Sequence, residues 1–307
     1  MNYKKIVLKI GVSLIILTAV ERFCYYKTAG FALHKVMSAF PSDSRYDIAS
    51  ITEGDIEQVN GILNQNFYFL DKGRQAYAFI SEDGQYVLKL LKCSYIRVPY
   101  LIKHLPAFGM IKQMRDAWID RRENIHHKTF ISCKLSYEEL KEETGLIFVH
   151  LNPVKQVEKP VQIIDRIGIA FTLDLNDTVF AIQKTAVLAT DRLQNAIECK
   201  DSEQVEHLLD DLIAFTVNRS LKGIDDADKS GVPRNFGYID GHIVQIDIGA
   251  FSKQQPPNPA EVIEQILQDK FSRLKNQLQE NFPDSLPFLE ERIKTSCKRG
   301  INPEESI

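Results

Sequence analysis

The chain lacks the features that mark several common classes of protein. Its five cysteines are far apart and odd in number, and no Cys-x-x-Cys pair occurs, so no disulfide framework is indicated. The net charge is only −3, which argues against bulk binding of nucleic acid. The sequence also lacks repeats and long low-complexity runs. What is present is an ordinary folded composition, 44% hydrophobic and 26% charged, in 307 residues that can bury a sizeable core.

The N-terminal apolar run is short for a membrane-spanning helix. It covers residues 10–20, follows three lysines and ends at Glu21, whereas a spanning helix needs roughly 20 apolar residues. The basic start and the apolar core predict that residues 1–26 are a signal peptide or an uncleaved signal anchor. The protein would then be membrane-associated or exported. If the segment is a buried helix instead, we expect a cytoplasmic protein. Residues 27–60 would form an N-terminal extension.

A lysine stands in an apolar strand of the next segment. Three strands are expected at 67–70, 77–80 and 86–91, with a turn at Asp83-Gly84. Strand alternation places Val87, Lys89 and Leu91 on one face. An ammonium group between aliphatic side chains is costly to bury unless it meets an anion. Lys89 is therefore a candidate anion-binding residue, and the alternative is an exposed lysine in an ordinary meander.

The segment 235–251 predicts a β-hairpin with a polar end. Asp240-Gly241 is a two-residue turn signal, so the two arms bring Asn235 and Asp247 together. An amide and a carboxylate that converge in this way supply the oxygen ligands that suit Mg²⁺ beside phosphates. Gly249 then lets the backbone turn away without a Cβ clash.

The remaining pattern predicts more of the sheet and a helical second half. Helices are expected at 110–119 and 132–143, and further strands at 146–151, 163–173 and 178–182. The expected sheet is five-stranded and antiparallel. Residues 187–221 read as helical. The fold class is therefore α+β.

Taken together, these segments resemble a divergent member of the protein-kinase-like superfamily, which includes protein kinases and aminoglycoside phosphotransferases. Residues 70–78 line up with the glycine-rich loop, with Gly73 as its middle glycine and Ala78 as the residue that covers the nucleotide base. Val87-Leu-Lys89 matches the Val-Ala-Ile-Lys strand, and Asp247-Ile-Gly249 matches the Asp-Phe-Gly motif.

The chain departs from the family at the loop and at the catalytic aspartate. Asp71 and Ala76 replace the other two glycines, which weakens a backbone cradle for phosphate. The family's catalytic aspartate lies five residues before its metal-binding asparagine, and here that position is Ser230. Asp228 and Asp226 lie seven and nine residues before the asparagine, so either one would need a longer loop.

The resemblance implies a role for each matching residue. Lys89 would hold the α- and β-phosphates of ATP, and Asn235 and Asp247 would bind Mg²⁺. Asp228, or else Asp226, would orient the acceptor. The helix before residue 146 would supply a glutamate for the lysine. The candidates for that glutamate are Glu138, Glu139 and Glu142, and we take Glu139 as the expected site residue.

The resemblance also implies a bilobal kinase-like fold, with residues 61–186 as the N-lobe and 187–307 as a mostly helical C-lobe. The expected function is ATP- and Mg²⁺-dependent phosphoryl transfer to an unknown acceptor. Two alternatives remain open: a catalytically inactive pseudokinase that acts as a nucleotide-binding or regulatory module at a membrane, and a non-enzymatic envelope protein.

Overall fold

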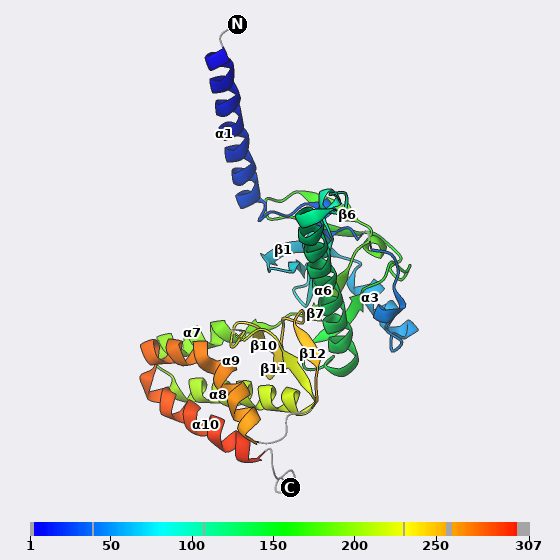
Figure 1. Cartoon of the computed structure of the whole chain (residues 1–307). Helices are drawn as coiled ribbons and strands as arrows, with labels where there is room; N and C mark the ends of the chain where they lie inside the picture. Colours follow the sequence, from blue (N-terminus) through cyan, green and yellow to red (C-terminus); the bar gives the residue numbers. More distant parts are fainter. Residues whose placement is uncertain (1–2, 39, 107, 230, 256–259, 300–307) are drawn as a thin grey trace.

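The computed structural model describes residues 3–38, 40–106, 108–229, 231–255 and 260–299. Within them the chain is an α+β protein. A seven-stranded sheet with its helices comes first and a mainly helical part follows, as Figure 1 shows. We call these parts the sheet lobe (described residues of 29–184) and the helical lobe (described residues of 187–299).

The elements follow in chain order. The helices are α1 Tyr3–Lys27, α2 Leu33–Val36, α3 Glu53–Ile62, α4 Cys93–Ile96, α5 Tyr100–Lys103, α6 Gly109–Glu139, α7 Ala189–Cys199, α8 Ser202–Leu221, α9 Ala260–Asn281 and α10 Leu286–Arg299. The strands are β1 Asn66–Lys72, β2 Ala76–Ser81, β3 Tyr86–Leu91, β4 Leu146–His150, β5 Val161–Ile164, β6 Ala170–Leu173, β7 Phe180–Lys184, β8 Val187–Leu188, β9 Ile224–Asp226, β10 Phe236–Ile239, β11 His242–Gln245 and β12 Phe251–Lys253. Short 3-10 turns lie at Ser44–Tyr46, Leu175–Asp177 and Pro283–Ser285.

The large sheet is mixed, which corrects the prediction of a five-stranded antiparallel sheet. Its strand order is β4-β7-β3-β2-β1-β5-β6. The five strands from β4 to β1 pair antiparallel with their neighbours, and β5 then joins β1 in parallel. The sheet is thus larger by the β5–β6 hairpin.

The extra hairpin arises from a turn inside a segment that was predicted as one strand, 163–173. Gly168 has a φ of 86°, which favours glycine, and it ends the extended conformation. The Asp165 carboxylate accepts the backbone N–H groups of Ile167 and Ile169 at 3.0 and 2.9 Å. An Asx-type turn of this kind reverses the chain, so that β6 pairs back onto β5.

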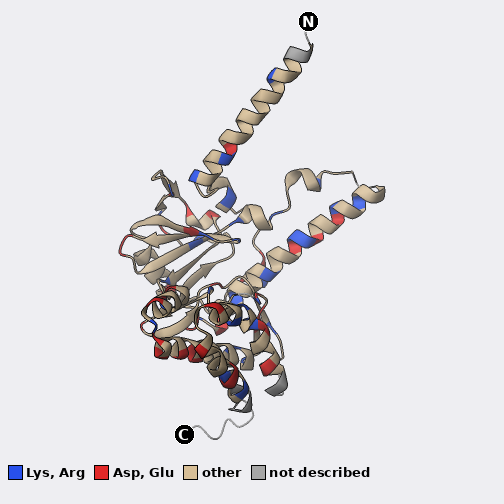
Figure 2. Ribbon diagram, turned by 90° about the vertical axis from the view of Figure 1, so that its left-hand side faces the viewer, with Lys and Arg blue, Asp and Glu red and all other residues tan. Residues whose placement is uncertain are grey.

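Helix α6 is longer than predicted. Separate helices were expected at 110–119 and 132–143, and the structure has one helix of 31 residues that ends at Glu139. The residues between the expected helices include neither proline nor glycine, so nothing in them breaks the helix. The C-terminal third of α6 packs on the sheet, whereas its N-terminal part extends away from the sheet lobe (Figure 2).

Both faces of the sheet are covered. One face packs against the segments before β1, including Phe31, Val59 and Leu63. The other face packs against the buried side of α6, which contacts β4, and Phe130 and Cys133 share a core cluster with residues of β4 and β7. Helix α6 therefore lies where its buried side covers apolar side chains of the sheet.

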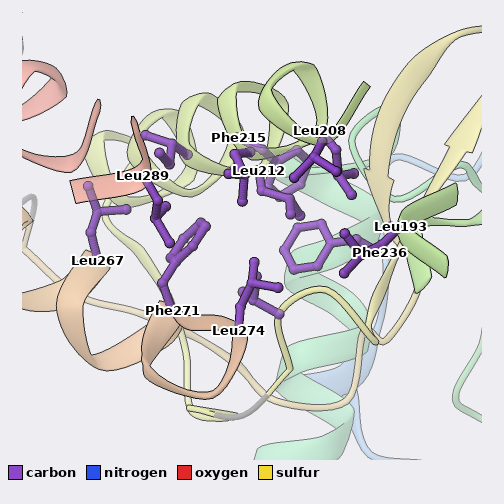
Figure 3. Packing of buried hydrophobic residues seen from close by; sticks show 14 of the residues in the cluster. Leu193, Leu208, Leu212, Phe215, Phe236, Leu267, Phe271, Leu274 and Leu289 are labelled. Carbon is purple, nitrogen blue, oxygen red and sulfur yellow. The ribbon is translucent and has the colours of Figure 1, made fainter. Parts of the chain in front are cut away.

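The helical lobe has a core of its own. Helices α7 to α10 surround Phe236 of β10, and Figure 3 shows how their apolar side chains converge. The labelled members of this cluster are Leu193, Leu208, Leu212, Phe215, Phe236, Leu267, Phe271, Leu274 and Leu289. The β10–β11 hairpin packs against this core through Phe236 and Tyr238.

Helix α1 stands away from the rest of the chain (Figure 1). Its apolar side chains are exposed, with Ile15 and Leu17 70% and 65% accessible. Among the described residues, no helix combines the length and the apolar character needed to cross a bilayer. Whether residues 1–26 act as a signal or an anchor stays a prediction.

The core of the helical lobe predicts a contrast between two leucines of α8. Leu212 is fully buried and Leu221 is 40% exposed. Leu212→Ala should lower the free energy of unfolding by about 3 kcal/mol, because it leaves a cavity in a packed core. Leu221→Ala should change it by less than about 1 kcal/mol. Urea unfolding measures both, and equal losses would contradict the packing described.

Candidate functional site

Lys89 lies on the α6 face of the sheet, in the middle of β3. Its cross-strand neighbours are Ala78 of β2 and Ala181 of β7. Its ammonium group donates a hydrogen bond to the backbone carbonyl of Ile246, at 2.6 Å from Nζ to O. Burial lowers the pKa of Lys89, and the Asp247 carboxylate opposes that shift. A cation of the sheet lobe thus meets the end of the hairpin from the helical lobe.

The β10–β11 hairpin forms as the sequence predicts. The strands pair antiparallel, and Asp240 and Gly241 have φ values of 50° and 84°, as a two-residue primed turn requires. Beyond β11 the backbone N–H of Ile246 donates to the carbonyl of Asn235 at 2.8 Å. This bond extends the pairing to the polar end, so Asn235 lies beside the residue that precedes Asp247.

Asn235 is held by the loop before it. Its amide donates to the Asp228 carboxylate at 3.0 Å, and Arg234 pairs with the same oxygen at 3.3 Å. Asn235 is buried and Asp228 is partly exposed. A Cβ on Gly231 would lie 2.6 Å from the Asn235 amide nitrogen, so only glycine leaves room there. The seven-residue interval between the two polar residues therefore folds back and brings them together.

Asp226 has different surroundings, although it lies only two residues earlier. It is 4% exposed at the end of β9, and its carboxylate accepts from Gln245 at 2.7 Å and lies 3.9 Å from Arg219. Burial raises the pKa of Asp226, and Arg219 opposes the shift. The other carboxylate oxygen accepts the backbone N–H of Asp228 at 2.9 Å. Asp226 is thus engaged in holding the loop that carries Asp228.

Ser132 of α6 fastens the segment after Asp247. Its hydroxyl donates to the Ile248 carbonyl and accepts from the Phe251 N–H, each at 2.6 Å. All of this lies in the core cluster that α6 shares with Ile248 and Phe251. This contact could not be predicted from the sequence, because a single serine within a helix does not indicate which distant segment its hydroxyl will meet.

The three glutamates proposed as partners of Lys89 lie elsewhere. Glu139 forms an ion pair with Lys253 of β12, Glu138 lies 3.9 Å from Lys134, and Glu142 is exposed. The α6 residue that interacts electrostatically with Lys89 is Cys133, a buried thiol whose pKa burial raises to about 12. Lys89 is therefore oriented by a backbone carbonyl and not by a helical carboxylate.

The loop that matches the glycine-rich loop is a tight turn between β1 and β2. The N–H of Gly73 donates to Ala76 O at 2.9 Å, and the Lys92 ammonium donates to the Gly73 carbonyl. A Cβ on Gly249 would lie 2.0 Å from Gln75 Oε1 and 3.5 Å from Asp247 Oδ1. The side chain of Gln75 therefore lies over the Asp-Ile-Gly segment.

The arrangement brings together a cation, two carboxylates and an amide from distant parts of the chain. Ala78, Val87 and Lys89 share one face of the sheet, and Asn235, Asp228 and the residues around Asp247 gather at the hairpin end. The described residues include no group of three or more His, Cys, Asp and Glu placed for a metal. Ser230, which takes the family's aspartate position, lies outside the described residues.

A separate surface pocket of about 820 Å³ lies between α3 and the β1–β5 pair. Its lining includes Glu53, Glu57 and Glu158. Carboxylates of this kind repel phosphate, so this pocket does not suit a nucleotide.

Comparison with known proteins finds weak likenesses in structure. No protein-family model matches the chain, and no curated protein does. Two structures of the bifunctional kinase-methyltransferase WbdD are 15% and 14% identical, with TM-scores of 0.33 and 0.32. They align with 72% and 74% of this chain. The chain spans less than half of each, 43% and 46%. The Rv3197–erythromycin complex from Mycobacterium tuberculosis is 13% identical with a TM-score of 0.31, over 92% of this chain and 75% of that one. Likenesses this weak carry no argument about this chain.

The Ser132 contact predicts a specific loss of stability. Ser132→Ala leaves the Ile248 carbonyl and the Phe251 N–H unpaired in the core, so the free energy of unfolding should fall by about 2 kcal/mol. Ser136→Ala is the matched control, because Ser136 is equally buried and only donates to a carbonyl of its own helix. Its cost should stay below about 1 kcal/mol. Urea unfolding with similar losses for both variants would refute the bridging role.

Lys92 predicts a pH dependence of stability. Burial, then the charges of Lys72 and Lys35, lower the pKa of Lys92 from 10.5 to about 8. Between these two values the unfolded chain holds the proton and the folded chain does not. The stability that Lys92 contributes therefore rises with pH across this window. Urea unfolding at pH 7 and pH 9.5 should show the unaltered chain gaining stability relative to Lys92→Met. A constant difference would contradict the shift.

Proposed function

We propose that the chain is a phosphotransferase of the kinase-like type, which binds ATP with Mg²⁺ between the sheet lobe and the β10–β11 hairpin. The observation that carries the proposal is the hydrogen bond from Lys89 to the Ile246 carbonyl, 157 residues along the chain. The bond joins Lys89 to the residue before Asp247, and this supports a nucleotide site that would use both residues. The strand order from β4 to β1 and the hairpin before Asp247 support the same assignment.

The residues here have the chemical groups that such a site needs. In this proposal Lys89 leaves the Ile246 carbonyl and binds the phosphates of ATP, while the aliphatic face at Ala78 and Val87 covers the base. Asn235 and Asp247 supply oxygen ligands for Mg²⁺, which would neutralise the charge that develops on the transferred phosphoryl group.

Asp228 is the better candidate for the acceptor-orienting carboxylate. It touches Asn235 and is partly exposed, whereas Asp226 is buried and bonded to Gln245 and to the Asp228 N–H. An acceptor hydroxyl must reach the carboxylate from solvent, which favours Asp228. Asp226 would act as a positioning residue, since it holds the loop that presents Asp228.

A second candidate is nucleotide binding without turnover. Two observations favour it, because active kinases pair this lysine with a glutamate. Glu139 forms an ion pair with Lys253, and Cys133 is the α6 residue that interacts electrostatically with Lys89. Gln75 over Gly249 also narrows the space beside Asp247. A pseudokinase of this kind would bind Mg-ATP as a regulatory module, and attachment to a membrane through residues 1–26 belongs to the same proposal.

Thermal unfolding of the full chain with Mg-ATP tests the binding. A ligand at 100 times its Kd stabilises a protein by about 2.7 kcal/mol, so the midpoint temperature should rise by several degrees. Lys89→Ala and Asp247→Ala should each abolish the rise. The controls Lys184→Ala and Asp191→Ala, which alter exposed residues, should keep it. So should Glu139→Gln, because Glu139 pairs with Lys253. No rise in the unaltered chain would contradict both candidates and favour the non-enzymatic alternative.

Release of ADP then separates the two candidates. An active enzyme should hydrolyse ATP slowly in water, and Asp228→Asn should reduce that rate by about 100-fold or more while the thermal shift remains. If the unaltered chain binds Mg-ATP and releases no ADP over hours, nucleotide binding without turnover is the better description.

A further inference from the structure

Cations surround the foot of helix α1. Lys35 and Lys72 lie 5.6 and 4.8 Å from the ring of Tyr25, and Arg166 of the β5–β6 turn lies 6.0 Å from the ring of Tyr26. Lys27 ends α1, and Lys92 lies near enough to Lys72 and Lys35 for their charges to act on it. We call these five cations the collar (Lys27, Lys35, Lys72, Lys92 and Arg166).

The charge of the collar is only partly balanced. Asp71 is the carboxylate that acts on Lys92, against two lysines. Lys35 and Lys92 donate to the carbonyls of Gly30 and Gly73, which do not cancel their charge. Like charges repel, and the chain gathers them on one surface from four separate segments, so the collar is suited to an anionic partner.

Exposed apolar and aromatic side chains lie beside the collar. Tyr26 is 69% accessible, and Ile167 and Ile169 flank the same turn as Arg166 with 49% each. Helix α1 continues from the collar with its apolar side chains exposed. Tyrosines and cations at the end of an apolar surface are the groups that bind at the boundary between lipid headgroups and acyl chains.

A second surface of the same composition lies at the free end of α6. We call it the tip (described residues of 97–115). It contains Arg97, Lys103, Lys112 and Arg115, of which Arg115 pairs with the Asp116 carboxylate that follows, at 2.7 Å. It also exposes several large apolar side chains: Tyr100, Leu101, Phe108, Met110 and Met114. Figure 2 shows α1 and the free end of α6 projecting to the same side of the sheet lobe.

We propose that this face of the sheet lobe binds a lipid bilayer that carries anionic headgroups, with the collar and the tip as its two contacts. Headgroup phosphates would meet the cations, and the apolar side chains of α1 and the tip would enter the boundary region. One planar, negatively charged partner explains why two separate surfaces of the same character point the same way. The proposal is independent of phosphoryl transfer, because neither contact includes Lys89, Asn235 or Asp247.

Flotation of the full chain with vesicles tests the proposal. The chain should float with vesicles of phosphatidylcholine and phosphatidylglycerol, and much less with phosphatidylcholine alone. High salt should weaken the binding, because it screens the exposed charges. Equal binding to both vesicle types would overturn the role of the cations.

Two triple variants test the two contacts. Lys27→Glu/Lys72→Glu/Arg166→Glu in the collar should lower the partition coefficient about 100-fold or more, since each cation near an anionic surface contributes about fivefold. Leu101→Ser/Met110→Ser/Met114→Ser in the tip should lower it about tenfold or more. Full binding in either variant would overturn the proposal.

Matched controls carry the same changes elsewhere. Lys200→Glu/Arg273→Glu/Lys294→Glu makes the same change in net charge on exposed residues of the helical lobe. Val154→Ser/Leu221→Ser/Val262→Ser removes exposed apolar groups away from the tip. Both controls should bind vesicles as the unaltered chain does. Circular dichroism should show all four variants folded.

Self-association is the competing explanation for exposed apolar surface. Sedimentation velocity without lipid decides it. The proposal expects the unaltered chain and the collar and tip variants to have the same oligomeric state. If either variant converts an oligomer into a monomer, the face is an interface between copies of this chain and the membrane proposal is wrong.

Discussion

The partly buried ammonium group of Lys89 is the constraint on which the rest of the site depends. A cation on a sheet face that is otherwise apolar needs an acceptor, and the Ile246 carbonyl supplies one from the far part of the chain. The contact can form only if the hairpin end reaches the α6 face of the sheet. Ser132 and the pairing of β9 with β12 hold that end in place. The two lobes therefore meet at a point that polar chemistry determines.

The polar groups around that point differ in their burial. Arg219, Gln245 and Asp226 form a buried network below the loop, and Lys270 donates to the Asp226 carbonyl from α9. Asp228 is partly exposed and bonds the buried Asn235. Burial of one carboxylate two residues before another gives the two residues different environments, and the proposed function assigns the loop-holding role to the buried one.

Local signals were sufficient for the hairpin and for the strand that carries Lys89. Asp240-Gly241 has strong turn chemistry, and alternation in β3 needs only nearby residues. The choice between Asp226 and Asp228 could not be predicted, because it depends on Arg219 and Lys270, which are distant in sequence. The β5–β6 hairpin was missed because the side chain of Asp165 makes its turn. The glutamates near residue 139 were plausible by position, but the end of α6 directs Glu139 toward Lys253.

The acceptor that meets Lys89 belongs to the main chain. A carbonyl oxygen is present whatever side chain stands at position 246, so substitutions there cannot delete it, whereas a glutamate partner is lost in a single mutation. Such a pairing also needs no helix to swing inward before the lysine is oriented. Substitution of the α6 glutamates would therefore leave the acceptor of Lys89 in place, whereas Ser132 of the same helix fastens the segment that follows it.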